Sequence, residues 1–354
     1  MPLRVGVIGV GALGRHHVRL LATESPWAQL AGAHDARPER AAFAEQYGAR
    51  AFADPDELIA ACDAVVVASA TASHRAVAGR VLAAGRHCLV EKPLAASGAE
   101  CDELLALAER HGRVLHVGHV ERMNPAVRAA RALIRRPRFI ESHRLASFAP
   151  RGVDVDVLLD LMIHDLDLVL DWTGQEPESV AAVGVAVLTE REDIANARLE
   201  FPDGCVANLT ASRVSQERMR KLRLFQADAY LSLDCGEGTA EIVEADRAAL
   251  AAVTRDALAA LAAGAPAAPG APAAPGAPPA AALPDWGSLV TRRPLPAPTG
   301  NPLALELEAF GRAAAGLPPL PGIDPADGAA GARAVRVAER LAEALRARVR
   351  RWGL

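Results

Sequence analysis

Three glycines spaced as GxGxxG near the start of the chain constrain its fold more than any other feature. Gly9, Gly11 and Gly14 follow an apolar run at residues 3–8 and precede a helical pattern at residues 14–21. In that context the first glycine allows a tight turn, the second lets the backbone approach a pyrophosphate, and the third allows close helix–strand packing. The pattern predicts a Rossmann unit whose helix N-terminus faces the phosphates of a dinucleotide.

An acidic residue stands where such a unit contacts the ribose. Asp35 follows Gly14 by 21 residues, at the end of a second predicted strand over residues 28–34. A carboxylate there accepts hydrogen bonds from the ribose hydroxyls and repels a 2′-phosphate. The sequence therefore favours NAD over NADP as the cofactor, although Arg37 could pair with such a phosphate and weakens that preference.

Further apolar runs extend this unit into a parallel sheet. Residues 64–68, 87–90 and 114–117 have the composition of strands that are buried on both faces, and helical patterns separate them. We therefore expect an α/β Rossmann domain, binding NAD, over residues 1–121.

The pattern changes near Asn124-Pro125, which is typical of a helix start with asparagine as N-cap and proline in the first turn. Two alternating segments, residues 196–201 and 205–212, flank a Pro-Asp-Gly turn, and other strand-like segments follow. Residues 122–354 are therefore expected to form an α+β domain, for substrate binding and oligomerisation, with a mostly antiparallel, open sheet.

Low-complexity sequence interrupts the second domain. Units similar to APAAPG repeat within residues 262–282 and offer nothing to bury, so we expect a flexible insert over residues 262–300. The longest uncharged stretch, residues 257–284, is long enough to span a bilayer, but its prolines and glycines exclude a membrane helix.

Composition narrows the class of protein. The net charge of −4 gives no reason to expect nucleic acid or a membrane as a partner. The five cysteines are scattered and never spaced as CxxC, which argues against a disulfide scaffold and a thiolate zinc site. We expect no metal, and a reducing, cytoplasmic location.

A lysine follows a predicted strand at the edge of the parallel sheet where ligands of such folds bind. In Glu91-Lys92-Pro93, the Lys92 ammonium could hold a substrate hydroxyl and stabilise the alkoxide as hydride leaves. The alternative is a solvated lysine in a loop. The chain has only one other lysine, Lys221, which favours a functional role for Lys92.

A predicted helix over residues 156–172 carries a narrow polar stripe. Apart from Asp165, its polar residues fall on one face, and they are Asp156, Asp160, His164, Asp167 and Asp171. Asp160 lies one turn before His164, where a carboxylate can orient an imidazole and raise its basicity. The alternative is an amphipathic helix that faces solvent with this stripe. A zinc site is less favoured, because the sequence has no second cluster of ligands to complete the coordination.

The junction between the predicted domains holds two further candidates. Arg122 could bind a substrate phosphate through two hydrogen bonds, and Asn124 could contact the substrate. The alternative is that this segment is a linker that ends in a helix cap.

Taken together, GVGALG, Asp35, Glu91-Lys92-Pro93 and the Asp160/His164 pair resemble the Gfo/Idh/MocA family of sugar and polyol dehydrogenases over nearly the whole chain. The resemblance implies a catalytic group of Lys92, Asp160 and His164, with the histidine as base. It also implies a homodimer or homotetramer joined through the second domain's sheet. The cofactor-binding positions that it implies are Gly9, Gly11, Ala12, Leu13, Gly14, Asp35, Ser69, Thr71, His74, Glu91 and Lys92.

Two segments resemble one group within that family, the UDP-N-acetylglucosamine 3-dehydrogenases. They are VGHVERMNPA and FAPRGVDVDVLLDLMIHDLDL. The resemblance implies NAD-dependent oxidation of a secondary alcohol of a sugar nucleotide to its 3-keto form, for amino sugars of lipid A. The substrate contacts would be Lys92, Arg122, Asn124, Asp160 and His164. The alternatives are a free sugar or inositol dehydrogenase, a reductase, and a non-catalytic NAD-binding regulator.

Overall fold

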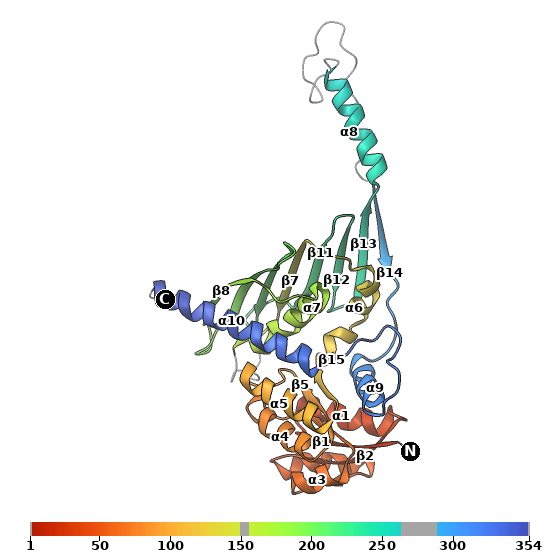
Figure 1. Cartoon of the computed structure of the whole chain (residues 1–354), viewed down its shortest axis with the longest axis vertical. Coiled ribbons are helices and arrows are strands. Elements are labelled where there is room, and N and C mark those ends of the chain that lie inside the picture. Colours follow the sequence, from red (N-terminus) through yellow and green to blue (C-terminus); the bar gives the residue numbers. More distant parts are fainter. Residues whose placement is uncertain (1, 149–155, 263–288, 353–354) are drawn as a thin grey trace.

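The computed structural model of the chain describes residues 2–148, 156–262 and 289–352. These residues form two sheets, each covered by helices. The first sheet belongs to the N-terminal domain, and the larger second sheet belongs to the domain that follows it (Figure 1). Residues 149–155 of the second resembling segment, and residues 263–288 of the expected insert, lie outside the described residues.

The first sheet has the order β15-β6-β5-β4-β1-β2-β3, and its strands β1 to β6 are parallel. Its strands are β1 (Leu3–Ile8), β2 (Ala28–His34), β3 (Arg50–Ala51), β4 (Ala64–Val67), β5 (His87–Glu91), β6 (Leu115–Gly118) and β15 (Ala326–Asp327). Its helices are α1 (Ala12–Thr23), α2 (Pro38–Ala41), η1 (Ala42–Tyr47), α3 (Pro55–Ala61), α4 (Thr71–Ala83) and α5 (Gly98–His111). The predicted Rossmann fold is confirmed, and β4 is buried along its whole length, as its composition indicated.

The second sheet has the order β14-β13-β12-β11-β7-β10-β9-β8. Its strands are β7 (Phe139–Leu145), β8 (Ser179–Val185), β9 (Ile194–Glu200), β10 (Val206–Ser212), β11 (Met219–Phe225), β12 (Ala229–Asp234), β13 (Thr239–Ala245) and β14 (Val290–Leu295). All neighbours are antiparallel except β7 and β10. The expected α+β domain with a mostly antiparallel, open sheet is therefore confirmed.

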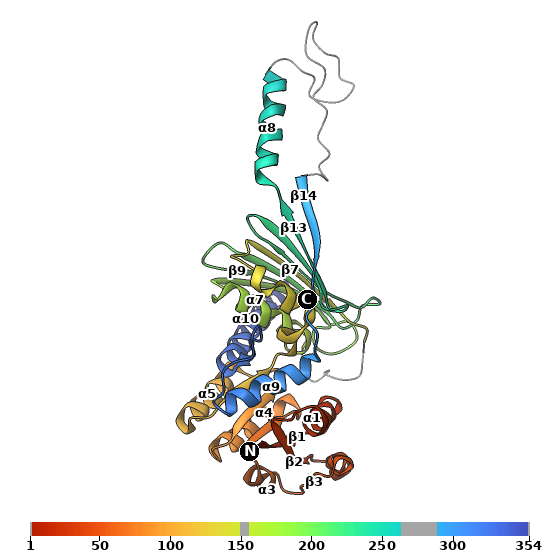
Figure 2. The ribbon, with the colours of Figure 1, turned by 90° about the vertical axis from the view of Figure 1, so that its right-hand side faces the viewer.

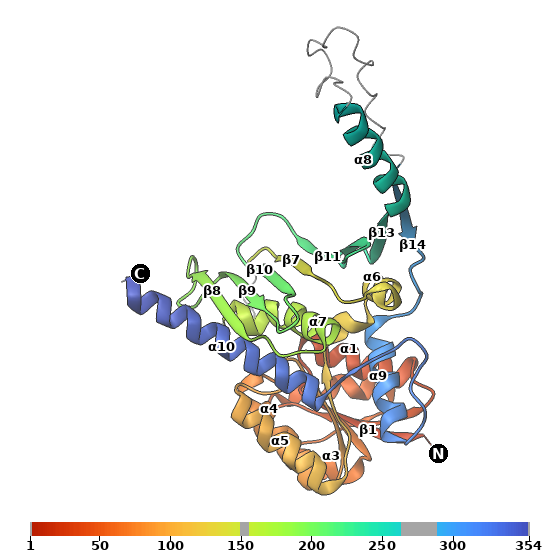
Figure 3. The same cartoon turned by 45° about the horizontal axis from the view of Figure 1, so that its top comes forward.

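Helices cover one face of this second sheet and connect it to the first domain. They are η2 (Val120–Met123), α6 (Pro125–Ala130), η3 (Arg131–Leu133), a π-helix η4 (Leu158–Met162), α7 (Ile163–Thr173) and α10 (Gly328–Trp352). The long helix α10 packs against α7 and β8 on one side and α5 on the other, so it joins the two domains along much of its length (Figure 3).

The C-terminal part of the chain returns to the first domain, which the division at residue 121 did not anticipate. Helix α9 (Pro302–Ala314) buries Leu307 and Phe310 in the same cluster as Val5 and Val7 of β1. Strand β15 then pairs antiparallel with β6 at the edge of the parallel sheet. Sequence separation hides such contacts, because nothing local in these residues identifies the sheet that they join.

The expected flexible insert is wrong for residues 290–295. They form β14, which pairs with β13, and Arg292 makes two hydrogen bonds to Glu241 on that strand. Pro294 is tolerated because β14 is an edge strand. Helix α8 (Arg247–Ala262) precedes the insert and extends beyond the end of the sheet (Figure 2).

No helix in the described parts of the chain combines the length and apolar character that crossing a membrane requires.

The docking of α9 predicts the effect of truncating its central side chain. Phe310→Ala should lower the free energy of unfolding by about 3–5 kcal/mol, because Phe310 is fully buried against the first domain. Leu317→Ala, at a residue with 51% of its surface exposed, should change it by no more than about 0.5 kcal/mol. Urea denaturation measures both values, and equal stability of the two variants would contradict the observed docking.

Candidate active site

The glycine loop has the geometry that a dinucleotide requires. Gly9 has φ of +92°, which favours glycine, and a Cβ on Gly14 would lie 1.9 Å from the Gly9 carbonyl oxygen. At Gly11 a Cβ would meet nothing within 4 Å, so the space that the glycine leaves is open. Helix α1 begins at Ala12, directly beside this space, and Leu13 lies in its first turn. The loop therefore fits a bound pyrophosphate.

Asp35 is held firmly at the end of β2 by the backbone. Its two carboxylate oxygens accept hydrogen bonds from the amides of Val10 at 2.7 Å and Arg37 at 2.9 Å. A cavity of about 250 Å³ beside the loop is lined by Val10, Gly11, Ala12, Arg15 and Arg40. The carboxylate is thus fixed next to the glycine loop, as ribose recognition requires.

The loop after β4 contains Ser69, Thr71 and His74, and the structure gives His74 a supporting role. Its Nδ1 lies 2.8 Å from the Pro93 carbonyl oxygen and its Nε2 lies 3.0 Å from that of Ser69, and only 1% of its surface is exposed. Burial also lowers the pKa of His74. Its ring braces the loops that follow β4 and β5, whereas Ser69 and Thr71 are only partly buried.

Glu91, the last residue of β5, fixes the strand end that carries Lys92. The carboxylate is 7% exposed and lies 2.6 Å from Nε2 of His17 on α1. A Cβ on Gly118 would come within 2.8 Å of the Glu91 carboxylate, so β6 needs glycine at this position. The end of β5 is therefore fixed by contacts from both neighbours, α1 and β6.

Lys92 connects the first domain to the π-helix of the second. Its Nζ donates to the Asp160 carbonyl oxygen at 2.5 Å and lies 3.5 Å from the carboxylate oxygen Oδ1 of the same residue. Burial lowers the pKa of Lys92, partly offset by the negative charges of Asp160 and Glu91. With 19% of the side chain exposed, the ammonium remains accessible to a substrate.

The predicted helix over residues 156–172 is interrupted by a π-helical turn. Residues 158–162 form this turn, and the α-helix begins only at Ile163. Asp160 lies in the turn and contacts Lys92, and among the described residues no hydrogen bond joins Asp160 to His164. The expectation that Asp160 orients His164 is therefore corrected, because the Asp160 side chain and carbonyl both face Lys92. Such turns occur frequently at functional sites.

His164 is a buried imidazole whose surroundings favour the neutral form. Burial lowers the pKa of His164 well below 6.5, and the charges of Lys92 and Arg144 lower it further. Its Nδ1 is buried without a hydrogen-bond partner among the described residues. The ring of His119 packs edge-on against it, with centroids 6.5 Å apart. At neutral pH the unprotonated imidazole is ready to accept a proton.

Lys92, Asp160 and His164 line one cavity of about 460 Å³ between the two domains. The other lining residues are Leu13, Glu91, Gly118, Val120, Glu121, Arg144, Leu145, Ala146, Ser147, Leu161, Arg213 and Arg220. The cavity thus joins the glycine loop to the second sheet. Within the described ranges, no group of three or more His, Cys, Asp or Glu side chains is arranged to hold a metal ion.

The suggested substrate contacts of Arg122 and Asn124 do not fit the structure. Arg122 is 5% exposed and directs its guanidinium to Asp167 at 2.7 Å and Asp171 at 3.0 Å. Asn124 caps α6 by accepting from the Ala126 amide, and its side-chain amide donates to the carbonyl oxygen of residue 235. Both side chains are bonded within the protein, and neither lines the cavity. For Asn124 the structure agrees with the alternative, a linker that ends in a helix cap.

Sequence reasoning missed three arginines and one glutamate of the cavity, namely Glu121, Arg144, Arg213 and Arg220. The sequence does carry a signal for Arg220. It lies two residues before Leu222 and four before Leu224, so it shares their face of the strand, which is turned towards the helices. A charged residue at such a position indicates a polar cavity.

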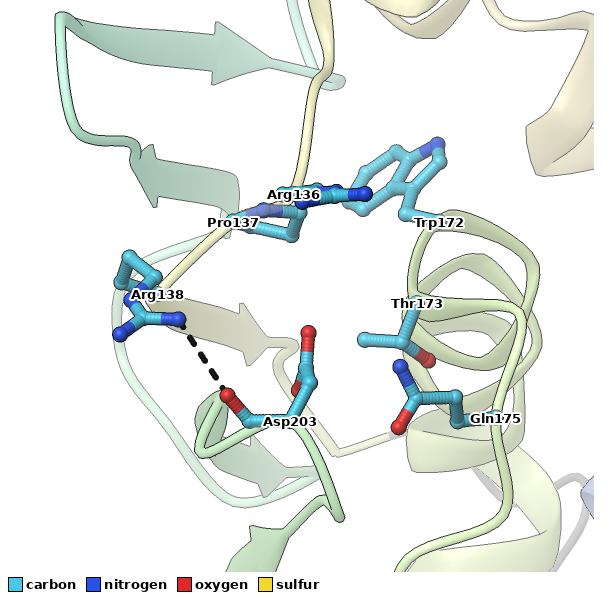
Figure 4. Close-up of a pocket in the computed structure, with 7 residues that line it drawn as sticks. All are labelled: Arg136, Pro137, Arg138, Trp172, Thr173, Gln175 and Asp203. Atoms are coloured by element: carbon cyan, nitrogen blue, oxygen red, sulfur yellow. Dashed lines mark hydrogen bonds between the residues drawn. The ribbon is translucent and has the colours of Figure 1, made fainter.

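Another cavity, of about 350 Å³, lies at the other end of α7 from the one around Lys92 (Figure 4). It is lined by Arg136, Pro137, Arg138, Trp172, Thr173, Gln175 and Asp203, and Arg138 donates to the carbonyl oxygen of Asp203 at 3.2 Å. It contains neither the lysine nor the histidine of the first cavity, so the cavity around Lys92 is the candidate active site.

Both parts of the chain match known family models. A model described as "Oxidoreductase family, NAD-binding Rossmann fold" of Gfo/Idh/MocA matches residues 3–119, and one described as "GFO/IDH/MocA C-terminal domain" matches residues 126–241. A UDP-N-acetylglucosamine 3-dehydrogenase from Acidithiobacillus ferrooxidans is 45% identical over 285 residues, covering 75% of this chain and 90% of that protein. An inositol 2-dehydrogenase from Saccharopolyspora erythraea is 38% identical over 187 residues, covering 50% of this chain and 55% of that protein.

Solved structures agree with these matches. A structure of the Acidithiobacillus ferrooxidans enzyme superposes with a TM-score of 0.81 at 38% identity, covering 98% of each chain. An aldose-aldose oxidoreductase from Caulobacter crescentus has a TM-score of 0.73 over 98% of each chain. At 20% identity, that second likeness concerns the fold alone.

The buried pairing of Arg122 predicts a structural effect of its removal. Arg122→Ala should lower the free energy of unfolding by about 3–5 kcal/mol, because the buried Asp167 loses its bidentate partner, whereas Asp171 keeps Arg131. The control Arg198→Ala removes an exposed pair with Glu200 and should cost no more than about 1 kcal/mol. Urea denaturation compares them. Equal stability of Arg122→Ala and Arg198→Ala would contradict a stabilising role for the buried Arg122–Asp167 pair.

Proposed function

Because the chain belongs to the Gfo/Idh/MocA oxidoreductase family, we propose that it oxidises a secondary alcohol of a sugar nucleotide, with UDP-N-acetylglucosamine as substrate and carbon 3 as the oxidised position. The observation that carries the proposal is the convergence of Lys92, Asp160 and His164 in one cavity that begins at the glycine loop. The 45% identity to an enzyme of that specificity supports the choice of substrate.

Each residue of the group has a distinct task. NAD, when bound, supplies the acceptor for the hydride that leaves the carbinol carbon. The Lys92 ammonium donates a hydrogen bond to the substrate hydroxyl oxygen and stabilises the negative charge that develops there. His164 takes the hydroxyl proton, so that the product is a ketone and the proton remains on the imidazole. Asp160 holds the lysine in place.

The cofactor is expected to lie along the carboxyl edge of the first sheet. Gly9, Gly11 and Gly14 would surround the pyrophosphate with Ala12 and Leu13 of α1, and Asp35 would accept the ribose hydroxyls. The loops that carry Ser69, Thr71 and Glu91-Lys92 would face the nicotinamide half, and His74 would support them. This arrangement places the redox carbon near Lys92.

We also place the reaction in the cytoplasm, on the route to 3-amino sugars of lipid A, as the resemblance implies.

The outer face of the second sheet supports a homodimer or homotetramer. Phe225 is 38% exposed there, with its ring 4.8 Å from that of Tyr230 and 5.7 Å from that of Phe139. Exposed aromatic clusters are typical of contact surfaces.

The first test of this function is the appearance of NADH on mixing the protein with NAD, UDP-N-acetylglucosamine and a trap for ketones. Lys92→Ala should lower kcat/KM by about 10²–10³-fold, because the developing charge loses its donor. Lys221→Ala is the matched control, since Lys221 is on the outer face of β11 and should leave the rate unchanged. Full activity of Lys92→Ala would contradict the assignment.

The same assay separates the alternatives. Oxidation of myo-inositol in place of the sugar nucleotide would favour the specificity of the inositol 2-dehydrogenase relative. Binding of NAD without turnover of any alcohol would favour a regulator.

The dependence of kcat/KM on pH provides an independent check. The reaction needs neutral His164, whose pKa lies well below 6.5 because of burial, so activity should persist into acid and fall only below pH 6.5. It also needs protonated Lys92, whose pKa burial lowers from 10.5, so the alkaline fall should begin below pH 10.5. Initial rates across the pH range measure both limbs. An acid limb above pH 7 would exclude His164 as the base.

A further inference from the structure

Three neighbouring strands of the second sheet direct an arginine into the active-site cavity. Arg144 lies near the end of β7, Arg213 directly follows β10, and Arg220 lies at the start of β11. These strands are adjacent in the order β11-β7-β10, and Arg144 and Arg220 are directly opposite each other. All three side chains line the cavity that holds Lys92 and His164. The sheet therefore forms a cationic wall of the cavity.

Two of these arginines are already committed to buried carboxylates. Arg144 makes hydrogen bonds of 3.0 and 2.7 Å to Asp165 on α7, and its side chain is 5% exposed. Arg213 bonds to Asp193 at 2.8 Å and is 4% exposed. Charges paired in this way hold the wall in shape, and a ligand gains little from them.

Arg220 differs from both. Its side chain is 56% exposed, and its Nη1 lies 3.7 Å from Glu121 Oε1, which is longer than a hydrogen bond. The side chain stands on the same face of β11 as Leu222 and Leu224, which are buried under the helices. A guanidinium at an inward position, with its donors accessible from the cavity, is arranged to bind an anion.

We propose that Arg220 forms a diphosphate subsite on the sheet side of the cavity in which Lys92 and His164 hold the reacting alcohol. This inference rests on the proposed function, because it identifies the diphosphate as that of a sugar nucleotide. The planar guanidinium binds phosphate oxygens through paired hydrogen bonds, and the sugar then extends from this anchor towards Lys92.

Glu121 lies beside Arg220 in the same cavity. It lines the cavity, is 6% exposed, and its Oε2 has no hydrogen-bond partner among the residues that the structure describes. Its charge is paired with Arg144, whose Nη2 lies 3.5 Å away, but the oxygen can still accept a hydrogen bond from a ligand such as a sugar hydroxyl. The same carboxylate keeps the Arg220 guanidinium near the cavity when no phosphate is present.

The test measures binding of UDP by calorimetry in the presence of saturating NAD, so that the cofactor site is filled. Arg220→Gln should weaken UDP binding by about tenfold to a hundredfold, because charge-assisted hydrogen bonds to phosphate are lost. Binding of uridine, which lacks the phosphates, should be the same in wild type and variant. NAD affinity and thermal stability should also be unchanged, since Arg220 is largely exposed.

Arg223→Gln is the matched control. Arg223 is on the same strand but on the outer face, where it bonds to Glu141, so its removal should leave UDP affinity unchanged. In steady-state assays, Arg220→Gln should raise KM for UDP-N-acetylglucosamine by a similar factor, with a smaller effect on kcat.

The outcomes separate this inference from the function on which it rests. If UDP-N-acetylglucosamine is oxidised but Arg220→Gln binds UDP as tightly as wild type, the subsite is wrong and the function stands. If the wild type neither binds UDP nor oxidises the sugar nucleotide, both are wrong. An equal loss of affinity in Arg220→Gln and Arg223→Gln would indicate a general charge effect and would also overturn the subsite.

Discussion

The position of α7 depends on neutralising the carboxylates that it buries. Asp165 and Asp167 are 1% and 2% exposed, and buried carboxylates are costly unless each has a partner. Arg144 approaches Asp165 from the second sheet, and Arg122 approaches Asp167 from the junction between domains. These two pairs clamp α7 from opposite sides. His164 lies at the start of α7, directly after the π-helix, so these two pairs also fix the position of His164.

The polar stripe of this helix can be recognised in the sequence, but its residues have different roles because they make different tertiary contacts. Asp156 caps the start of the helical segment through the Leu159 amide. Asp160 and His164 reach the cavity, whereas Asp167 is buried against Arg122. The sequence could not distinguish these fates, because Arg122 is 45 residues from Asp167. Periodicity identifies a shared face, and only the fold decides what each part of that face meets.

Local signals were sufficient for the glycine loop and the parallel sheet around it. The glycine spacing, Asp35 and the β-branched run of β4 each specify their own backbone geometry, so strand order and loop position follow from general rules for parallel sheets. The same rules place Lys92 at the carboxyl edge. The sheet side of the cavity escaped prediction because Arg144 and Arg220 approach each other only through the pairing of β7 with β11. A register between distant strands has no local signature.

The return of α9 to the first domain has an electrostatic consequence behind the active site. Glu306 on α9 is 2% exposed; burial raises the pKa of its carboxyl well above 4.5, and the charges of Glu91 and Asp167 raise it further. The neutral form of the Glu306 carboxyl is therefore favoured over the charged form, which limits the negative charge beside Glu91 and Asp167. Glu91 remains free to pair with His17 and to fix the strand end that carries Lys92. The late segment of the chain thus packs behind the strand end that carries Lys92, and the environment of Glu306 favours a neutral carboxyl there.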